Sequence, residues 1–183
     1  MRHATRTRPR RLLLAVAPLL LVLLLALTLR LIVWRWREQY ALGGDEQEYF
    51  NQALTLLRDH RYVELRLMRP PLYTGFLAAC MYLLDSLVQR VRLVQAIISA
   101  LTVVPVFLLA RRLFRRRRVA LLAALLCALS YTLAANATEL LTETLFVFGL
   151  TMWLWLVLGA GRRRAAAAGL VLGGLILLRS VAL

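Results

Sequence analysis

The chain has 183 residues, of which 61% are hydrophobic, and a mean hydropathy of +0.70. Soluble domains are about 45–50% apolar, so this composition excludes an ordinary water-soluble globule. All 24 basic residues are arginine and only nine residues are acidic, which gives a net charge of +15. The arginines lie in short runs between apolar stretches of membrane length. We therefore interpret them as the topology signal of an integral membrane protein and not as a nucleic-acid-binding surface.

Apolar stretches of membrane length follow one another along the chain. A hydrocarbon core about 30 Å thick requires about 20 mostly apolar residues per helix. The predicted spans are 12–34, 91–110, 119–137, 144–161 and 165–183, with Arg179 inside the last. The first apolar run is too long for a cleaved signal peptide, so we expect it to remain as an anchor. The predicted fold is an all-α, polytopic transmembrane helix bundle of about five spans.

The charges predict the orientation of the bundle. Arginines without any acid lie before the first span, between the second and third, and after the fourth (Arg2, Arg6, Arg8, Arg10, Arg11; Arg111, Arg112, Arg115–Arg118; Arg162–Arg164). All nine acids lie in the alternate segments (Glu38, Asp45, Glu46, Glu48, Asp59, Glu64, Asp85, Glu139, Glu143). By the positive-inside rule, the N-terminus is cytoplasmic and the acids face the outer side of the cell membrane.

The first outer loop, residues 35–90, is long and has helical patterns of its own. From Asp45 to Asp59, the residues Phe50, Ala53, Leu54 and Leu57 recur at helical spacing, which predicts an amphipathic helix on the outer membrane face. A second pattern begins at Pro70-Pro71 and runs to about Leu84. It is too short to span a membrane, so we expect an interfacial or partly immersed helix that starts at the proline pair.

The segment Gly43–Tyr49 contains three carboxylates in four residues, Asp45, Glu46 and Glu48. Asp45 followed by Glu48 is also a capping-box pattern, so a helix cap is one interpretation. The cap leaves Glu46 unexplained. Clustered carboxylates near a membrane surface can supply a proton acceptor or a cation site, which is the other interpretation.

Arg69 precedes a predicted helix start, where backbone N–H groups favour anions. A guanidinium matches phosphate oxygens with paired donors, so the sequence allows a phosphate site here. An arginine that reaches for lipid headgroups is the alternative.

Glu139 and Glu143 are four residues apart, which predicts that they share one helix face at the outer end of the third and fourth spans. Acids so close to hydrocarbon are functional candidates, although a solvated turn at Asn136-Ala137-Thr138 is the alternative. Arg179, at the outer end of the fifth span, is either a snorkelling anchor or a second phosphate contact.

Other chemistries lack support in the sequence. Cys80 and Cys127 lie in apolar surroundings and give no disulfide framework, and neither histidine has metal-ligand spacing with a cysteine. Neither a phosphate-binding glycine loop nor a nucleophile elbow is present. We assign no cofactor and keep a divalent metal as a possibility.

In this order and on these sides of the membrane, the motifs resemble the N-terminal part of a polytopic GT-C glycosyltransferase. The resemblance is to the family 39 and RgtA/B/C/D-like enzymes, which are relatives of the protein O-mannosyltransferases and the lipid A aminoarabinose transferases. The motifs that carry it are Gly44-Asp45-Glu46-x-x-Tyr49, Arg69-Pro70-Pro71-Leu72-Tyr73, Ala110-Arg111-Arg112-Leu113-Phe114, Thr142-Glu143-Thr144-Leu145-Phe146, Gly169-Leu170-x-x-Gly173 and Leu178-Arg179. Since such enzymes are several hundred residues long, we expect this chain to be a fragment, and the isolated chain need not be active.

The resemblance implies roles for individual residues. Asp45 takes the place of the catalytic acid and Arg69 that of the residue that contacts the donor phosphate. Glu143 lines the same site with Glu139 as a neighbour, and Arg179 takes the place of a basic residue near it. The motifs also place Glu46, Tyr49 and Tyr73 in the substrate-binding site.

The implied activity is inverting transfer of a sugar from a polyprenyl-phosphate donor to a hydroxyl or amine on the outer membrane face. The acceptor is a lipid, a glycan or a protein, and membrane lipids surround the enzyme. Nucleotide sugars are absent outside, and a polyprenyl phosphate leaves without a general acid. Asp45 would then be the base, Arg69 the phosphate clamp, and the apolar face of the two loop helices the tail groove. The alternative is a non-catalytic scaffold, a transporter-like bundle or an inactive truncated fragment.

Overall fold

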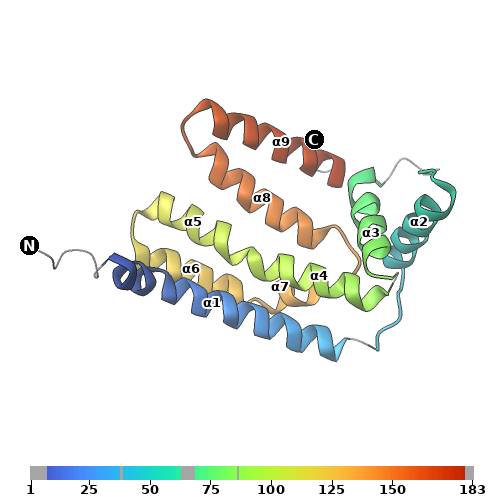
Figure 1. The fold of residues 1–183 in the computed structure, drawn as a ribbon, viewed down its shortest axis with the longest axis horizontal. Helices are drawn as coiled ribbons and strands as arrows, with labels where there is room; N and C mark the ends of the chain where they lie inside the picture. Colours follow the sequence, from blue (N-terminus) through green and yellow to red (C-terminus); the bar gives the residue numbers. More distant parts are fainter. Residues whose placement is uncertain (1–7, 38, 63–68, 86, 180–183) are drawn as a thin grey trace, which may run out of the picture.

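The computed structural model describes residues 8–37, 39–62, 69–85 and 87–179. The predicted topology residues Arg2, Arg6, Glu38 and Glu64 lie outside these ranges, as does 180–183 at the end of the predicted fifth span. Within them the chain forms α-helices and no strand, which confirms the all-α prediction (Figure 1). In chain order the helices are α1 (Arg8–Trp36), α2 (Asp45–Asp59), α3 (Pro71–Leu83), α4 (Val88–Leu101), α5 (Val103–Phe114), α6 (Arg117–Leu129), α7 (Tyr131–Asn136), α8 (Glu143–Val157) and α9 (Arg162–Leu178).

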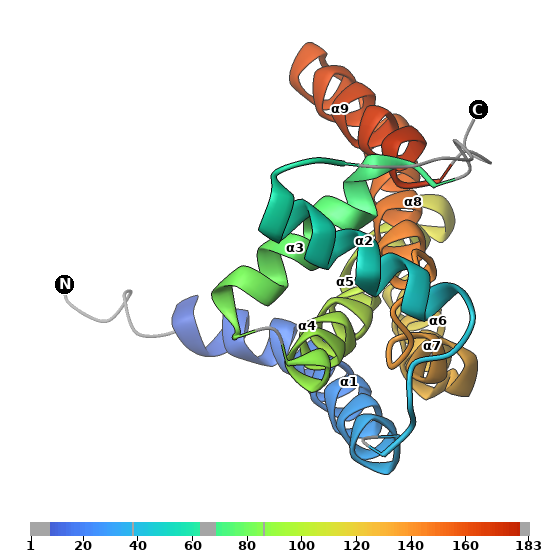
Figure 2. The same ribbon diagram turned by 90° about the vertical axis from the view of Figure 1, so that its right-hand side faces the viewer.

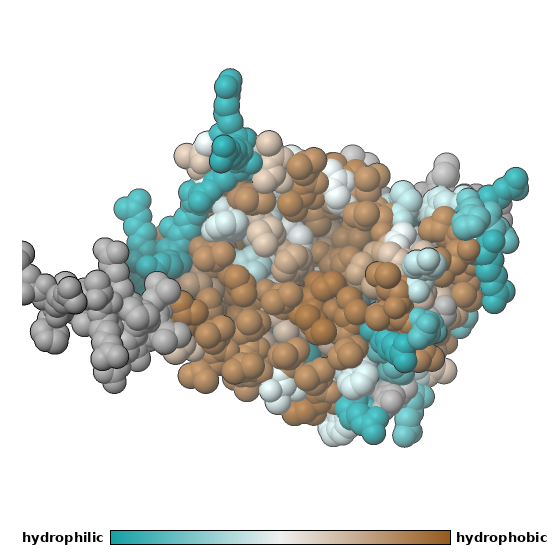
Figure 3. Space-filling model, in the orientation of Figure 1, coloured by the Kyte–Doolittle hydropathy of each residue, from teal (hydrophilic) through white to brown (hydrophobic). Residues whose placement is uncertain are grey.

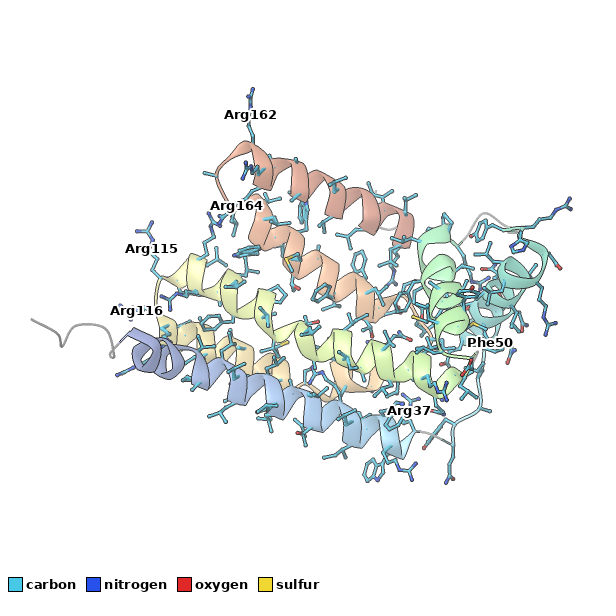
Figure 4. The ribbon with its side chains drawn as sticks, in the orientation of Figure 1. Arg37, Phe50, Arg115, Arg116, Arg162 and Arg164 are labelled. Carbon is cyan, nitrogen blue, oxygen red and sulfur yellow. The ribbon has the colours of Figure 1, made fainter. Side chains whose placement is uncertain are left out.

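The longer helices run along the long axis of the molecule, whereas α2 and α3 cross one end of it (Figures 1 and 2). Arg115, Arg116, Arg162 and Arg164 lie at the opposite end, far from Phe50 of α2 (Figure 4). Between the two ends the visible surface is mainly apolar, and the hydrophilic residues gather toward the ends (Figure 3). This arrangement separates the arginine runs from the α2–α3 end, as the predicted topology requires. Which end is cytoplasmic stays a prediction.

Among the described residues, two helical stretches are long and apolar enough to cross a membrane, Val16–Trp36 and Val88–Phe114. They match the first two predicted spans. The second comprises α4 and α5, which meet at Thr102. Pro105 has no N–H to donate to the carbonyl of Leu101 one turn earlier, which explains a break at this point. The apolar helix α8 is shorter, and the predicted third span is divided between α6 and α7 at Ser130. The count of about five spans stays a prediction.

A buried arginine completes the hydrogen bonds at the end of α6. Arg30 of α1 is fully buried, and its Nη1 and Nη2 donate to the carbonyls of Ala128 and Cys127 at 2.7 and 3.1 Å. Its Nε donates to Ser99 Oγ at 3.1 Å. The last four carbonyls of a helix have no partner within the helix. Arg30 therefore satisfies acceptors that the break at Ser130 leaves open, and ties α1 to α4 and α6.

The helix α3 forms the core of the α2–α3 end. Its buried residues Tyr73, Leu77 and Met81 pack in one cluster with Leu140 and with Leu175 of α9. The helix α2 packs on the same cluster through Ala53, Phe50, Leu54 and Leu57, the residues whose spacing predicted its apolar face. The helix α2 has the predicted bounds, and α3 ends within one residue of its prediction. That these helices lie on the membrane surface stays a prediction.

The predicted topology places residue 60 outside the cell membrane and residue 116 inside. In a Cys80→Ala, Cys127→Ala background, an impermeant thiol reagent added to intact cells should label His60→Cys and leave Arg116→Cys unlabelled until the cells are opened. The reason is that inner segments hold arginines and no acids. Labelling of residue 116 from outside, with residue 60 protected, would contradict the orientation.

Candidate functional site

The centre of the candidate site is an arginine held between two carboxylates. Arg69 Nη2 lies 3.0 Å from Asp45 Oδ1, and Arg69 Nη1 contacts Glu48 Oε2. Burial lowers the pKa of Arg69, but the hydrogen bonds and charges of Asp45 and Glu48 outweigh it, and the net effect raises the pKa. The Asp45 side chain is 70% exposed, against 17% for Arg69. A charged carboxylate thus stands at the surface with a fixed cation behind it.

The capping interpretation of Asp45 is wrong. Gly44 is the N-cap of α2, and it makes no side-chain cap hydrogen bond because it has no side chain. Its φ of +52° lies in the left-handed region, which glycine adopts without strain. Asp45 is the first helical residue, and its carboxylate binds Arg69 instead of the backbone. The acid therefore belongs to the ion-pair cluster.

Glu46 points into the protein, where it binds an arginine that the sequence analysis did not include. Arg92 Nη2 lies 3.3 Å from Glu46 Oε1, and the side chains are 3% and 14% exposed. The same Oε1 accepts the backbone N–H of Leu140 at 2.8 Å. Arg92 Nη1 also donates to the carbonyl of Tyr40 at 3.0 Å. This pair joins the start of α2 to α4, to the linker after α1 and to the turn before α8.

Two tyrosines lie next to the cluster. The Arg69 guanidinium lies 5.3 Å from the ring centroid of Tyr49, and that ring meets Tyr73 edge to face at 4.9 Å. Burial raises the pKa of Tyr49, and the charge of Arg69 opposes this shift only in part. Tyr73 is fully buried, which raises its pKa well above the ordinary value, and its hydroxyl donates to Gln95 Oε1 at 3.5 Å. Both phenols therefore stay neutral and form a wall behind Arg69.

A further ion pair joins α8 to the end of α9. Arg179 Nη1 donates to Glu143 Oε1 at 3.1 Å, and its guanidinium lies 5.8 Å from the ring centroid of Phe146. The other carboxylate oxygen, Glu143 Oε2, is buried and has no hydrogen-bond partner in the described part of the chain. An unpartnered buried acceptor is costly unless a ligand or water completes it. Glu143 thus offers an acceptor near Tyr49, whose titration it influences.

Glu139 does not share a helix face with Glu143. The helix α8 begins at Glu143, and Glu139 lies in the preceding turn, where its N–H donates to the carbonyl of Asn136. The i,i+4 rule therefore does not apply, and the prediction was wrong for that reason. Glu139 Oε1 instead accepts from Arg37 Nη1 at 2.8 Å, toward the end of α1. The structure brings Asp45, Tyr49, Arg69 and Tyr73 together and sets Glu139 apart.

An apolar groove of about 330 Å³ lies between α3, α8 and α9. Its lining residues are Leu72, Phe76, Ile98, Leu145, Phe148, Gly149, Val171, Gly174, Leu175 and Leu178. Leu178 is bonded to Arg179, and Leu72 is three residues from Arg69. Each arginine is therefore close in sequence to a residue that lines the groove. Of the expected tail-binding surface, α3 takes part, whereas α2 contributes no lining residue. The helices α8 and α9 supply the other lining residues, together with Ile98 of α4.

Arg92, Arg37 and Gln95 are the polar residues of this region that sequence reasoning missed. One signal was available, because Arg92 lies at the start of the predicted span 91–110. A charged residue at such a place usually faces the bundle interior and has a partner. The partner could not be chosen from the sequence, since Glu46 is 46 positions away.

Metal binding stays a prediction without further support from the geometry. In the ranges that the structure describes, no group of three or more His, Cys, Asp or Glu side chains is close enough to hold a metal ion. Asp45 and Glu48 are held by Arg69, which supplies the positive charge between them.

The family model of dolichyl-phosphate-mannose-protein mannosyltransferases matches residues 68–182, which is more than half of the chain. The matched region contains Arg69, Tyr73, Glu139, Glu143 and Arg179 and begins after the acids of α2. No curated protein and no solved structure is significantly similar to the chain.

The buried pair of Glu46 and Arg92 predicts a stability effect that surface pairs do not share. Arg92→Met should lower the free energy of unfolding by about 3–5 kcal/mol, because it leaves a buried carboxylate without its cation. Thermal unfolding of the purified protein in detergent measures the loss. The matched control is Arg90→Met, since Arg90 pairs with Asp85 in an exposed position and should cost less than about 1 kcal/mol. Equal melting of the two variants would contradict the assignment.

Proposed function

The chain belongs to the dolichyl-phosphate-mannose-protein mannosyltransferase family of membrane glycosyltransferases, and on this premise we propose its reaction. It transfers a sugar from a polyprenyl-phosphate donor to a hydroxyl or amine of a lipid, glycan or protein acceptor. The transfer takes place on the outer face of the cell membrane and inverts the anomeric carbon.

The observation that carries this proposal is an apolar groove with two arginines close in sequence to its lining residues. A polyprenyl phosphate has a long hydrocarbon tail and an anionic head, so its site needs both surfaces next to each other. The groove between α3, α8 and α9 has an almost wholly apolar lining and a volume of about 330 Å³. Arg179 follows its lining residue Leu178, and Arg69 precedes α3, which supplies Leu72 and Phe76. The tail would occupy the groove, and the phosphate would contact the arginines.

Arg69 is the arginine that we assign to the phosphate. A guanidinium has five N–H donors, and two nitrogens of Arg69 already bind the carboxylates of Asp45 and Glu48. A bound phosphate would share or replace these carboxylates, which are acceptors of the same charge. Tyr49 and Tyr73 fix the guanidinium from behind, because one ring stacks against it and the other packs against that ring.

Asp45 is the proposed base. The acceptor O–H or N–H gives its proton to the Asp45 carboxylate while the acceptor atom forms a bond to the anomeric carbon. The bond from that carbon to the phosphate oxygen breaks, and its electron pair remains on the phosphate, where Arg69 stabilises the added charge. The carboxylate is 70% exposed, so an acceptor can reach it from the aqueous side. Attack opposite the leaving phosphate gives inversion.

Of the remaining predicted substrate contacts, Glu143 has the most direct support. Its Oε2 is buried and unpartnered in the described structure, so a sugar hydroxyl that donates to it would complete it. Arg179 orients this carboxylate. Glu46 and Tyr73 are enclosed by protein partners, and Glu139 pairs with Arg37. Their direct contact with substrate stays a prediction, and a role in holding the site agrees better with their burial.

Asp45→Asn should abolish most transfer and leave the fold intact. The carboxamide keeps a hydrogen-bond acceptor for Arg69 but cannot take the proton, so single-turnover transfer from a polyprenyl-phosphate sugar should fall at least about 10²-fold. Glu48→Gln is the matched control, since it removes the same charge from the same arginine. Its transfer rate should fall far less. If Asp45→Asn retains most activity, Asp45 is not the base.

Arg69→Lys should weaken use of the donor, because lysine keeps the charge and loses the paired donors. The expected loss in apparent donor affinity is about 1–3 kcal/mol, which is the range for hydrogen bonds to a charged group. Titration of transfer against the polyprenyl-phosphate sugar measures it. Arg90→Lys, at the exposed pair with Asp85, is the control and should keep the wild-type affinity. An unchanged donor affinity in Arg69→Lys would remove Arg69 from the phosphate site.

A further inference from the structure

A second cavity, of about 350 Å³, lies where the end of α1 meets α7. It is lined by Val33, Trp36, Arg37, Tyr40 and Tyr131 and shares no residue with the groove or with the ion pairs of Arg69. The residues Trp36, Tyr40 and Tyr131 are 78%, 61% and 67% exposed. Trp36 also ends the first candidate membrane span. Large rings with polar atoms beside a guanidinium suit the headgroup level of a bilayer better than its hydrocarbon.

Arg37 lines this cavity and has one guanidinium edge without a hydrogen bond in the described structure. Its Nη1 donates to Glu139 Oε1 at 2.8 Å and to the carbonyl of Ala135 at 3.4 Å, and its guanidinium lies 5.3 Å from the Tyr40 ring centroid. Its Nε and Nη2 have no hydrogen-bond partner within the described residues. These two nitrogens present parallel N–H groups, the arrangement that binds two oxygens of one phosphate. Glu139 thus orients the guanidinium without occupying that edge.

Exposed apolar side chains continue from this cavity along α1 and α6, which contact each other. They are Leu21, Leu25 and Ile32 on α1, and Leu122, Leu126 and Leu129 on α6. On α1 these residues precede Trp36 in the sequence and recur at helical spacing, and on α6 they precede Tyr131. A phosphate that carries acyl chains contacts both the cavity and these residues, whereas free phosphate contacts the cavity alone.

We propose that this cavity binds the phosphodiester headgroup of a glycerophospholipid, with the phosphate on Nε and Nη2 of Arg37 and the acyl chains along α1 and α6. The rings of Trp36, Tyr40 and Tyr131 enclose the headgroup. The occupant is a bilayer lipid and not the sugar donor, because the groove proposed for the donor is formed by α3, α8 and α9.

The bound lipid also supports the catalytic end of the protein. Arg92 donates to the carbonyls of Arg37 and Tyr40, at 3.5 and 3.0 Å, and the same guanidinium binds Glu46 beside Asp45. A headgroup that fixes Arg37 and Tyr40 therefore fixes the carbonyls that position Arg92. The lipid is a positioning ligand and takes no part in the transfer.

Native mass spectrometry of the purified protein in detergent tests the site directly and needs no transfer activity. The probe is dioleoylphosphatidylethanolamine, titrated against wild type, Trp36→Ala and Arg37→Gln. Each substitution should weaken binding about tenfold, the factor expected for a lost hydrogen bond to a charged group or a comparable aromatic contact. Tyr82→Ala, a similarly exposed ring on α3, is the control and should bind as wild type does.

Two further ligands separate a phospholipid site from its alternatives. Dioleoylglycerol, which lacks the phosphate, should bind no better to wild type than to Arg37→Gln, and inorganic phosphate should not displace the phospholipid. Any one of four results overturns the proposal. They are unchanged phospholipid binding by Trp36→Ala, equal binding of dioleoylglycerol and the phospholipid to wild type, displacement of the phospholipid by inorganic phosphate, and a polyprenyl phosphate retained in this cavity. Trp36 is mostly exposed, so its variant keeps the test valid if Arg37→Gln fails to fold.

Discussion

The arrangement of the site depends on burying one charged pair, Glu46 with Arg92. Removing two charges from water is expensive, and hydrogen bonds to their remaining polar atoms offset part of the cost. Here the partners are the carbonyls of Arg37 and Tyr40 and the N–H of Leu140, whereas Nε of Arg92 is buried without a hydrogen-bond partner in the described structure. Those backbone groups come from the linker after α1 and from the turn before α8. Satisfying one pair therefore fixes where α2 starts, and Asp45 is the neighbouring residue.

The same requirement, that buried polar groups be paired, shapes the bundle at Arg30. Its donors cover carbonyls at the end of α6, where the chain turns at Ser130 before α7 begins. The break lets α7 pack against α1 and brings Tyr131 and Glu139 to the end of that helix. An uninterrupted helix from 119 to 137 would leave Arg30 without these acceptors. The buried arginines of α1 and α4 thus determine how the α6–α8 segment reaches the site.

Local patterns predicted the helices well and the contacts between them poorly. Apolar spacing and the proline pair were sufficient for α2 and α3, because both signals act within one or two turns. Asp45 and Arg69 were identified as separate candidates, but nothing in their spacing of 24 residues shows that they form an ion pair. The i,i+4 rule failed for Glu139 and Glu143 because it assumes a continuous helix, and the chain turns between them. Arg92 was overlooked because its partner is distant in sequence.

The position of Arg69 between two carboxylates gives the proposed reaction an order. While the donor is absent, Asp45 and Glu48 share the guanidinium of Arg69. A donor phosphate on Arg69 competes for the same N–H groups and weakens their hold on Asp45. In the proposed reaction, an Asp45 carboxylate released from Arg69 is free to take the hydrogen bond and then the proton of the acceptor. Donor binding thus precedes activation of the acceptor, which limits activation of a hydroxyl or amine while no sugar is present.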